Sequence, residues 1–104
     1  MLAGQGKTGV QTAASQFDGK AVEIQGFVAQ RGELDMLIVD KIEAGRNETR
    51  PADTSVRDLG RWRLTGEICD GKCNSGAMRP GQGVAHKACA NLCLFGGVPP
   101  VFIA

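Results

Sequence analysis

All four cysteines and the only histidine of this chain lie between residues 69 and 93. Cys69 and Cys73 form one CxxxC pair, and Cys89 and Cys93 form a second after fifteen intervening residues, with His86 three residues before Cys89. Cysteines either form disulfides or, with histidine, bind metal ions. Disulfide formation and metal binding both require the two cysteine pairs to lie close together in the folded chain. This segment therefore constrains both the fold and the function.

The length and the composition set wider limits. A chain of 104 residues forms one domain, and folding buries only about two-thirds of its surface, which argues against an enzyme with a large cleft. With 42% hydrophobic residues, 22% charged residues and a net charge of +1, the composition is that of a folded protein without a strong field for nucleic acid or anionic membrane. No apolar stretch approaches the roughly 18 to 20 residues of a membrane span.

Apolar and polar residues alternate from residue 20, as they do in a half-buried strand. The strand contains Gly26, and a glycine in mid-strand usually marks a bulge or a sharp bend. Gly32 permits a turn, and a second apolar run of strand length follows at residues 34–39. We therefore predict a β-hairpin over residues 20–42.

The pattern of this first strand recurs forty residues later, which predicts a third strand at residues 61–68 with Trp62 on its apolar face. Glycine bends of this kind are typical of the first strands of OB-like barrels. Residues 84–95 have the length of a helix, and Gly96 follows as its C-terminal cap. The sequence therefore predicts a mainly β fold, a small OB-like β-barrel or antiparallel sheet with one α-helix near residues 84–95.

The chain divides into an arm and a domain. Residues 1–16 are rich in small and polar residues without an apolar period, which predicts a flexible N-terminal arm. Residues 17–104 form a single OB-like domain, with a long loop at 44–60 and a final strand at 98–104. The N-terminus has no charged start followed by an apolar segment, so no signal peptide is expected in this chain.

Structural disulfides are one interpretation of the cysteines. Cys89 and Cys93 are one turn apart on a helix, a geometry that does not suit a disulfide between them. Their partners are then Cys69 and Cys73, in either order, and the two bonds would staple the helix to the preceding strand. Loops of this length contribute roughly 3 kcal/mol each.

A metal site is the other interpretation. On a helix, His86, Cys89 and Cys93 lie within about 60° of one face. Three cysteines with His86, or all four cysteines, could surround a tetrahedral ion, and thiolate and imidazole ligands suit zinc or copper. The rise of about 10.5 Å from His86 to Cys93 is at the limit for sharing one ion. A histidine without a ligand role and inert thiols are the remaining alternatives.

Three motifs occur in a characteristic order: GEICDGKC at 66–73, HxxCxxxC at 86–93 and GGxPP at 96–100. With this order the chain resembles a group of uncharacterised small bacterial proteins that are exported and OB-like. The resemblance covers about the last forty residues and implies an OB-like barrel and a periplasmic or otherwise extracytoplasmic location. It also implies that the functional group is Cys73, His86, Cys89 and Cys93, with Cys69 as a disulfide partner or additional thiol, and it implies no activity.

The sequence therefore predicts a small extracytoplasmic binding or accessory domain whose Cys/His cluster binds zinc or copper or is stapled by disulfides. The alternatives are an OB-type nucleic-acid-binding module and a purely structural protein–protein adaptor. Few aromatic rings and a net charge of +1 disfavour nucleic acid as a partner, which leaves a metal ion or an unknown protein. The absence of CxxC disfavours a thiol oxidoreductase. Arg79 and Lys87, near the glycine-rich loop, are candidates for binding an anion.

Overall fold

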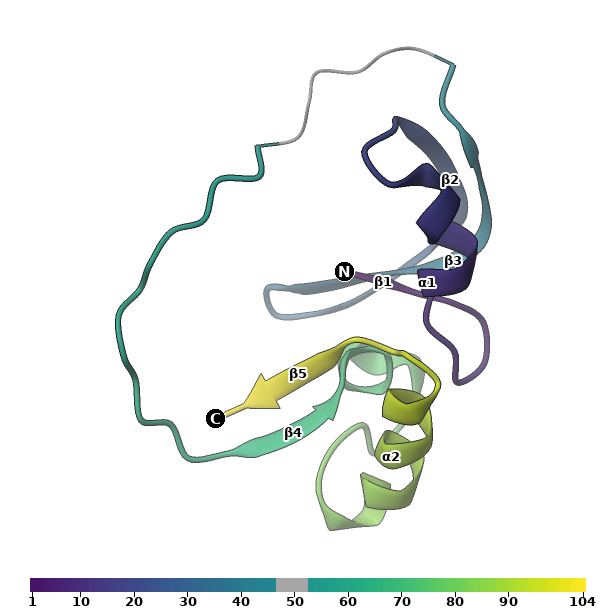
Figure 1. Ribbon diagram of the computed structural model, residues 1–104. Coiled ribbons are helices and arrows are strands. Elements are labelled where there is room, and N and C mark those ends of the chain that lie inside the picture. The colour runs from purple at the N-terminus through teal and green to yellow at the C-terminus, as the bar shows by residue number, and fades with distance from the viewer. Residues whose placement is uncertain (47–52) are drawn as a thin grey trace.

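The structure is a computed structural model, and it describes residues 1–46 and 53–104. It contains two small sheets, short helical segments and one longer helix near the C-terminus (Figure 1). One sheet has the strand order β1-β3-β2, and the other pairs β4 with β5. The strands are β1 (Leu2–Ala3), β2 (Val22–Arg31), β3 (Leu34–Ala44), β4 (Glu67–Asp70) and β5 (Pro100–Ile103). The helical segments are α1 (Gln11–Ala14), η1 (Ser15–Phe17), η2 (Cys73–Ala77), η3 (Val84–His86) and α2 (Lys87–Phe95).

The predicted hairpin is confirmed. Strands β2 and β3 are antiparallel, and Gly32, whose φ of 57° is in the left-handed region, begins the two-residue turn between them. The register shifts between Gln25 and Gly26, so the glycine marks a β-bulge as predicted. A Cβ atom on Gly26 would clash with the carbonyl oxygen of Ile38, which explains why glycine is needed there.

Substituting Gly26→Ala is expected to lower the free energy of unfolding by about 1–3 kcal/mol, because the new methyl group must displace the backbone of β3 at Ile38. Urea unfolding followed by circular dichroism measures this change. Val28→Ala is the control, since Val28 is exposed on the same strand, and it should cost less than about 1 kcal/mol. Equal stability of Gly26→Ala and the wild type would contradict the close approach of the strands.

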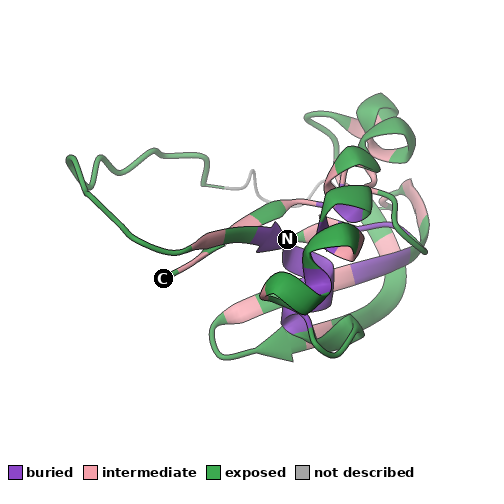
Figure 2. Ribbon diagram, turned by 90° about the horizontal axis from the view of Figure 1, so that it is seen from below, coloured by how far each residue is buried: buried purple, intermediate pink, exposed green. Residues whose placement is uncertain are grey.

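The core is formed by buried residues of β1, β3, η2 and α2, together with Val98 just before β5. Buried residues are purple in Figure 2. The members of the core are Ala3, Met36, Ile38, Cys73, Cys93 and Val98. Residues 1–16, for which the sequence predicts an arm, contain β1 and α1, and β1 pairs in parallel with β3. Two of the four cysteines are thus part of the core, and the N-terminal strand packs against them.

The helix expected near residues 84–95 is present in two parts. A 3₁₀ turn, η3, ends at His86, and α2 begins at Lys87 and ends at Phe95 before Gly96. The amide of Gly96 donates to the carbonyl of Leu92 at 3.0 Å, which closes the last turn. His86 therefore lies just before the α-helix rather than within it, and this position changes where its side chain points.

The expectation of an OB-like barrel or one antiparallel sheet is wrong. The described residues form a small α/β fold with two separate sheets and no closed barrel. The third strand, expected at 61–68, begins only at Glu67 and pairs with β5. Strand β3 already has β1 and β2 as its neighbours, so no edge of it is left for another strand. Trp62 consequently lies outside any strand and is 75% exposed.

The long loop predicted at 44–60 falls partly on residues 47–52, which lie outside the described residues. Residues 53–66 follow an exposed path without helix or strand. Among the helices of the described residues, none has the length and hydrophobicity needed to cross a bilayer.

Candidate metal centre

Three of the four cysteines converge at one end of the core. Cys73 begins η2 directly after the turn that follows β4, and Cys89 and Cys93 are one turn apart on α2. Their three Sγ atoms all lie within 4.8 Å of one another. Cys73 and Cys93 are buried, whereas Cys89 is half-buried. We call these three residues the thiol cluster, and it could hold a metal ion.

The size of the thiol cluster suits a single ion. Zinc binds thiolate sulfur at about 2.3 Å, so two sulfur ligands of one tetrahedral ion lie about 3.8 Å apart. The sulfur atoms of Cys73, Cys89 and Cys93 need to close by no more than about 1 Å to reach that separation. Rotation about their χ1 angles supplies such a movement without a change in the backbone.

None of the predicted disulfides is present. All four cysteines belong to the described residues, and all are free thiols. Cys69 lies in β4, outside the thiol cluster, and its thiol donates to the carbonyl oxygen of Gly81 at 2.8 Å. The interpretation of the cysteines as staples therefore finds no support, and the helix is held on β4 by packing instead.

The thiol cluster borders a cavity of about 300 Å³. The residues that line it are Gly6, Lys7, Lys72, Cys73, Ala77, Met78 and Cys93. The ammonium of Lys7 donates to Sγ of Cys89 at 2.7 Å, and the thiol of Cys89 lies 3.4 Å from Sδ of Met78. An ion held by the three thiols would therefore have a positive charge and a thioether beside it.

The wall of this cavity includes the N-terminal segment. The buried ammonium of Lys72 donates to the carbonyl oxygens of Gly4 at 2.6 Å and Gly6 at 2.9 Å. These two hydrogen bonds satisfy a cation that would otherwise be costly to bury. They also fix residues 4–6 next to the thiol cluster, which places Lys7 within reach of Cys89.

His86 is not part of the thiol cluster. Its Nε2 donates to Oδ2 of Asp70 at 2.9 Å, and the two side chains are only 2% and 0% exposed. The other oxygen of Asp70 accepts the backbone N–H of Cys73 at 2.8 Å. The resemblance implies one group of Cys73, Cys89, Cys93 and His86. In the structure the three cysteines converge, whereas His86 is hydrogen-bonded to Asp70, which is in turn hydrogen-bonded to the backbone of Cys73. Cys69, Asp70 and His86 form a second group with ligand atoms within 4.8 Å of one another.

Burial and charge shift the ionisation of these groups. Burial, assisted by the nearby charge of Asp70, raises the pKa of Cys69, Cys73 and Cys93 above that of an ordinary thiol. Burial alone would raise the pKa of Asp70, but the hydrogen bonds from Cys73 and His86 outweigh it and lower the pKa below its usual value. The hydrogen bond with Cys89 raises the pKa of Lys7. Cys73 and Cys93 are therefore protonated until a ligand displaces their protons.

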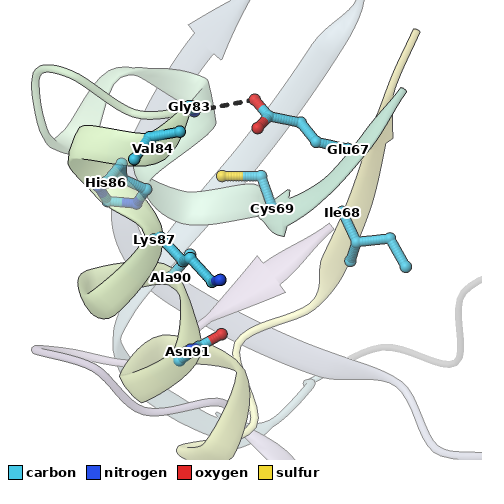
Figure 3. A pocket seen from close by; sticks show the side chains of 9 residues that line it. All are labelled: Glu67, Ile68, Cys69, Gly83, Val84, His86, Lys87, Ala90 and Asn91. Carbon is cyan, nitrogen blue, oxygen red and sulfur yellow. Dashed lines mark hydrogen bonds between the residues drawn. The ribbon is translucent and has the colours of Figure 1, made fainter. Parts of the chain in front are cut away.

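A second cavity, of about 270 Å³, lies between β4 and α2 (Figure 3). Lys87 lines it together with Cys69, His86 and Glu67, whose carboxylate accepts the backbone N–H of Gly83 at 2.9 Å. Arg79 is exposed and is not among its lining residues. The structure therefore does not bring Arg79 and Lys87 together around this cavity, and Glu67 adds a negative charge to its lining.

Three residues of the site were not identified from the sequence: Lys7, Asp70 and Met78. Asp70 precedes Cys73 by three residues, the spacing at which a carboxylate accepts the backbone N–H of a following turn, so a local signal for it exists. Met78 is exposed in a glycine-rich loop and has no distinguishing pattern. Lys7 is 82 residues from Cys89 and has no local signal at all.

Comparisons with protein-family models, with curated proteins and with solved structures found no match to the chain. A function for the protein must therefore be argued from the geometry and the chemistry of its own site.

Proposed function

We propose that the protein is a metal-binding domain in which the thiol cluster holds one zinc or copper(I) ion. The convergence of the Sγ atoms of Cys73, Cys89 and Cys93 within 4.8 Å carries this proposal. Thiolates are ligands of both ions. The domain is a binding or accessory protein, since its chemistry is concentrated in ligand atoms rather than in a nucleophile with a base beside it.

The surroundings of the cluster support ion binding. Three thiolates around a single cation leave a net negative charge, and the ammonium of Lys7 at 2.7 Å from Cys89 offsets part of it. The cavity of about 300 Å³ next to Cys73 and Cys93 gives an ion a path to the sulfur atoms and room for a fourth ligand. Cys73 and Cys93 are themselves buried in the core, so they keep water away from the side of the ion that faces the core.

Asp70 and His86 support the cluster rather than bind a separate ion. Both oxygens of Asp70 are already hydrogen-bonded, one to His86 and one to the backbone of Cys73. The thiol of Cys69 is bonded to Gly81. A second ion bound by Cys69, Asp70 and His86 would have to break these hydrogen bonds. When they are intact, the hydrogen bond from Cys73 to Asp70 orients Cys73, as hydrogen-bonded neighbours of a metal site orient its ligands.

Serine substitutions in the full chain test the proposal. With the protein reduced and metal-free, we expect one zinc or copper(I) ion per chain in titrations against a chromophoric chelator. Cys89→Ser removes a half-buried ligand with little disturbance of the core, and it should lower the affinity at least about tenfold. Cys73→Ser and Cys93→Ser should act in the same direction, with circular dichroism to show that each variant is folded.

Cys69→Ser is the matched control, because this thiol is buried near α2 but lies outside the thiol cluster. Its metal affinity should equal that of the wild type. An equal loss of affinity in Cys69→Ser and Cys89→Ser, or a folded and reduced wild type that binds neither ion, would overturn the proposal.

A further inference from the structure

We propose that Met78 is the fourth ligand of the thiol cluster and that the ion is therefore copper(I). This inference rests on the proposed function and specifies its metal. Its starting point is the position of the thioether: Sδ of Met78 lies 3.4 Å from Sγ of Cys89, and Met78 lines the same cavity as Cys73 and Cys93. The thiols of η2 and α2 and the thioether that directly follows η2 are thus close together.

The backbone places the thioether next to the thiols. Cys73 begins η2, and Met78 directly follows its last residue, Ala77. The chain leaves the helical turn at Gly76, whose φ of 119° is a conformation that glycine adopts readily and other residues rarely adopt. At Met78 the backbone is extended. This change of direction brings the side chain of Met78 back to the cavity that Cys73 lines from the other end of the turn.

The donor atoms around the cavity distinguish between the two ions. Zinc in proteins takes thiolate, imidazole and carboxylate ligands, whereas a thioether is a ligand of softer ions such as copper(I). The described residues that line this cavity include no carboxylate and no imidazole. His86, the only histidine, is bonded to Asp70 instead. The thioether of Met78 is therefore the side-chain ligand that the lining of this cavity offers beside the thiols.

The charges around the cavity also suit copper(I). Three thiolates with a divalent ion have a net charge of −1, and with a monovalent ion the net charge is −2, which needs more compensation in a partly buried site. Lys7 donates directly to Cys89, and the buried Lys72 lines the same cavity. Binding of copper(I) to three thiols releases three protons to solvent and leaves the oxidation state of the metal unchanged.

Met78→Leu in the full, reduced chain tests the inference. Leucine keeps the volume and removes the sulfur. Under anaerobic conditions, with copper(I) competed against bicinchoninate, the variant should bind copper(I) about tenfold or more weakly than the wild type. Its zinc affinity should stay unchanged, and X-ray absorption should show one sulfur fewer around copper. Met36→Leu, which removes the sulfur of a fully buried methionine in the core, should leave both affinities at the wild-type level.

The outcomes separate this inference from the proposed function. Unchanged copper(I) affinity in Met78→Leu, or an equal loss of copper(I) and zinc, would overturn the role of the thioether. If Cys89→Ser still loses the ion in that case, the thiol cluster stands as a metal site and only the choice of copper(I) fails. If Cys89→Ser also binds as the wild type does, the metal site and the inference fail together.

Discussion

Replacing His86 with alanine is expected to lower the free energy of unfolding by about 3–5 kcal/mol, because it leaves the carboxylate of Asp70 buried without its partner. Domains of this size are stable by about 5–15 kcal/mol, so the variant should lose a large part of its stability. Asp70 would retain one hydrogen bond, from the backbone of Cys73, and that bond does not compensate a buried charge.

Urea unfolding of metal-free, reduced protein measures this effect without a contribution from ligand binding. The exposed pair of Lys41 and Glu43, 3.1 Å apart with side chains 59% and 43% exposed, provides the control. Glu43→Gln should cost less than about 1 kcal/mol. In a double-mutant cycle, Asp70→Asn combined with His86→Ala should cost clearly less than the sum of the two single variants. Additive effects would show that the two side chains are not coupled.

Saturation with zinc or copper(I) is expected to stabilise the folded protein by about 4 kcal/mol when the free ion is at 1,000 times its dissociation constant. An ion held by the thiol cluster would link η2 to α2 through Cys73, Cys89 and Cys93, an arrangement that the unfolded chain does not maintain. For a domain of this size the midpoint of thermal unfolding should rise by more than about 10 °C.

Differential scanning calorimetry with and without the ion makes this measurement, and a chelator should reverse the shift. Cys89→Ser should show little or no shift, whereas Cys69→Ser should shift as the wild type does. A wild-type midpoint that stays constant while dialysis shows bound metal would mean that the unfolded chain binds the ion equally well. That result would contradict a site formed by the fold.

Local patterns predicted the local structure of this chain well. The alternation from residue 20 and the turn at Gly32 produce the β2–β3 hairpin, and Gly26 marks its bulge. The pattern at 61–68 is equally regular, yet strand β4 begins only at Glu67. Alternation describes side chains that fit the surface of a sheet, but a strand also needs a partner strand. Strand β5 pairs with residues 67–70 only, and no described strand pairs with residues 61–66. This is why the barrel was wrongly predicted.

The candidate site was predictable in part. The spacing of Cys89 and Cys93 on a helix placed both on one face, and the structure brings Cys73 to them. His86 was assigned by extending the same helical face backwards by one turn. The α-helix begins one residue after His86, so the side chain follows the geometry of the 3₁₀ turn and meets Asp70. The shorter α-helix therefore explains why the side chain of His86 lies outside the thiol cluster.

The distance along the chain between Lys7 and Cys89 determines when the site can form during synthesis. These residues are 82 positions apart, and ribosomes add about 5–20 residues per second, so Lys7 precedes Cys89 by roughly 4–16 seconds. Throughout this interval the nascent chain has neither the helix of Cys89 and Cys93 nor the core that these residues close. The complete thiol cluster therefore forms only after α2 has been translated, and until then the thiol of Cys73 has neither Cys89 nor Cys93 beside it.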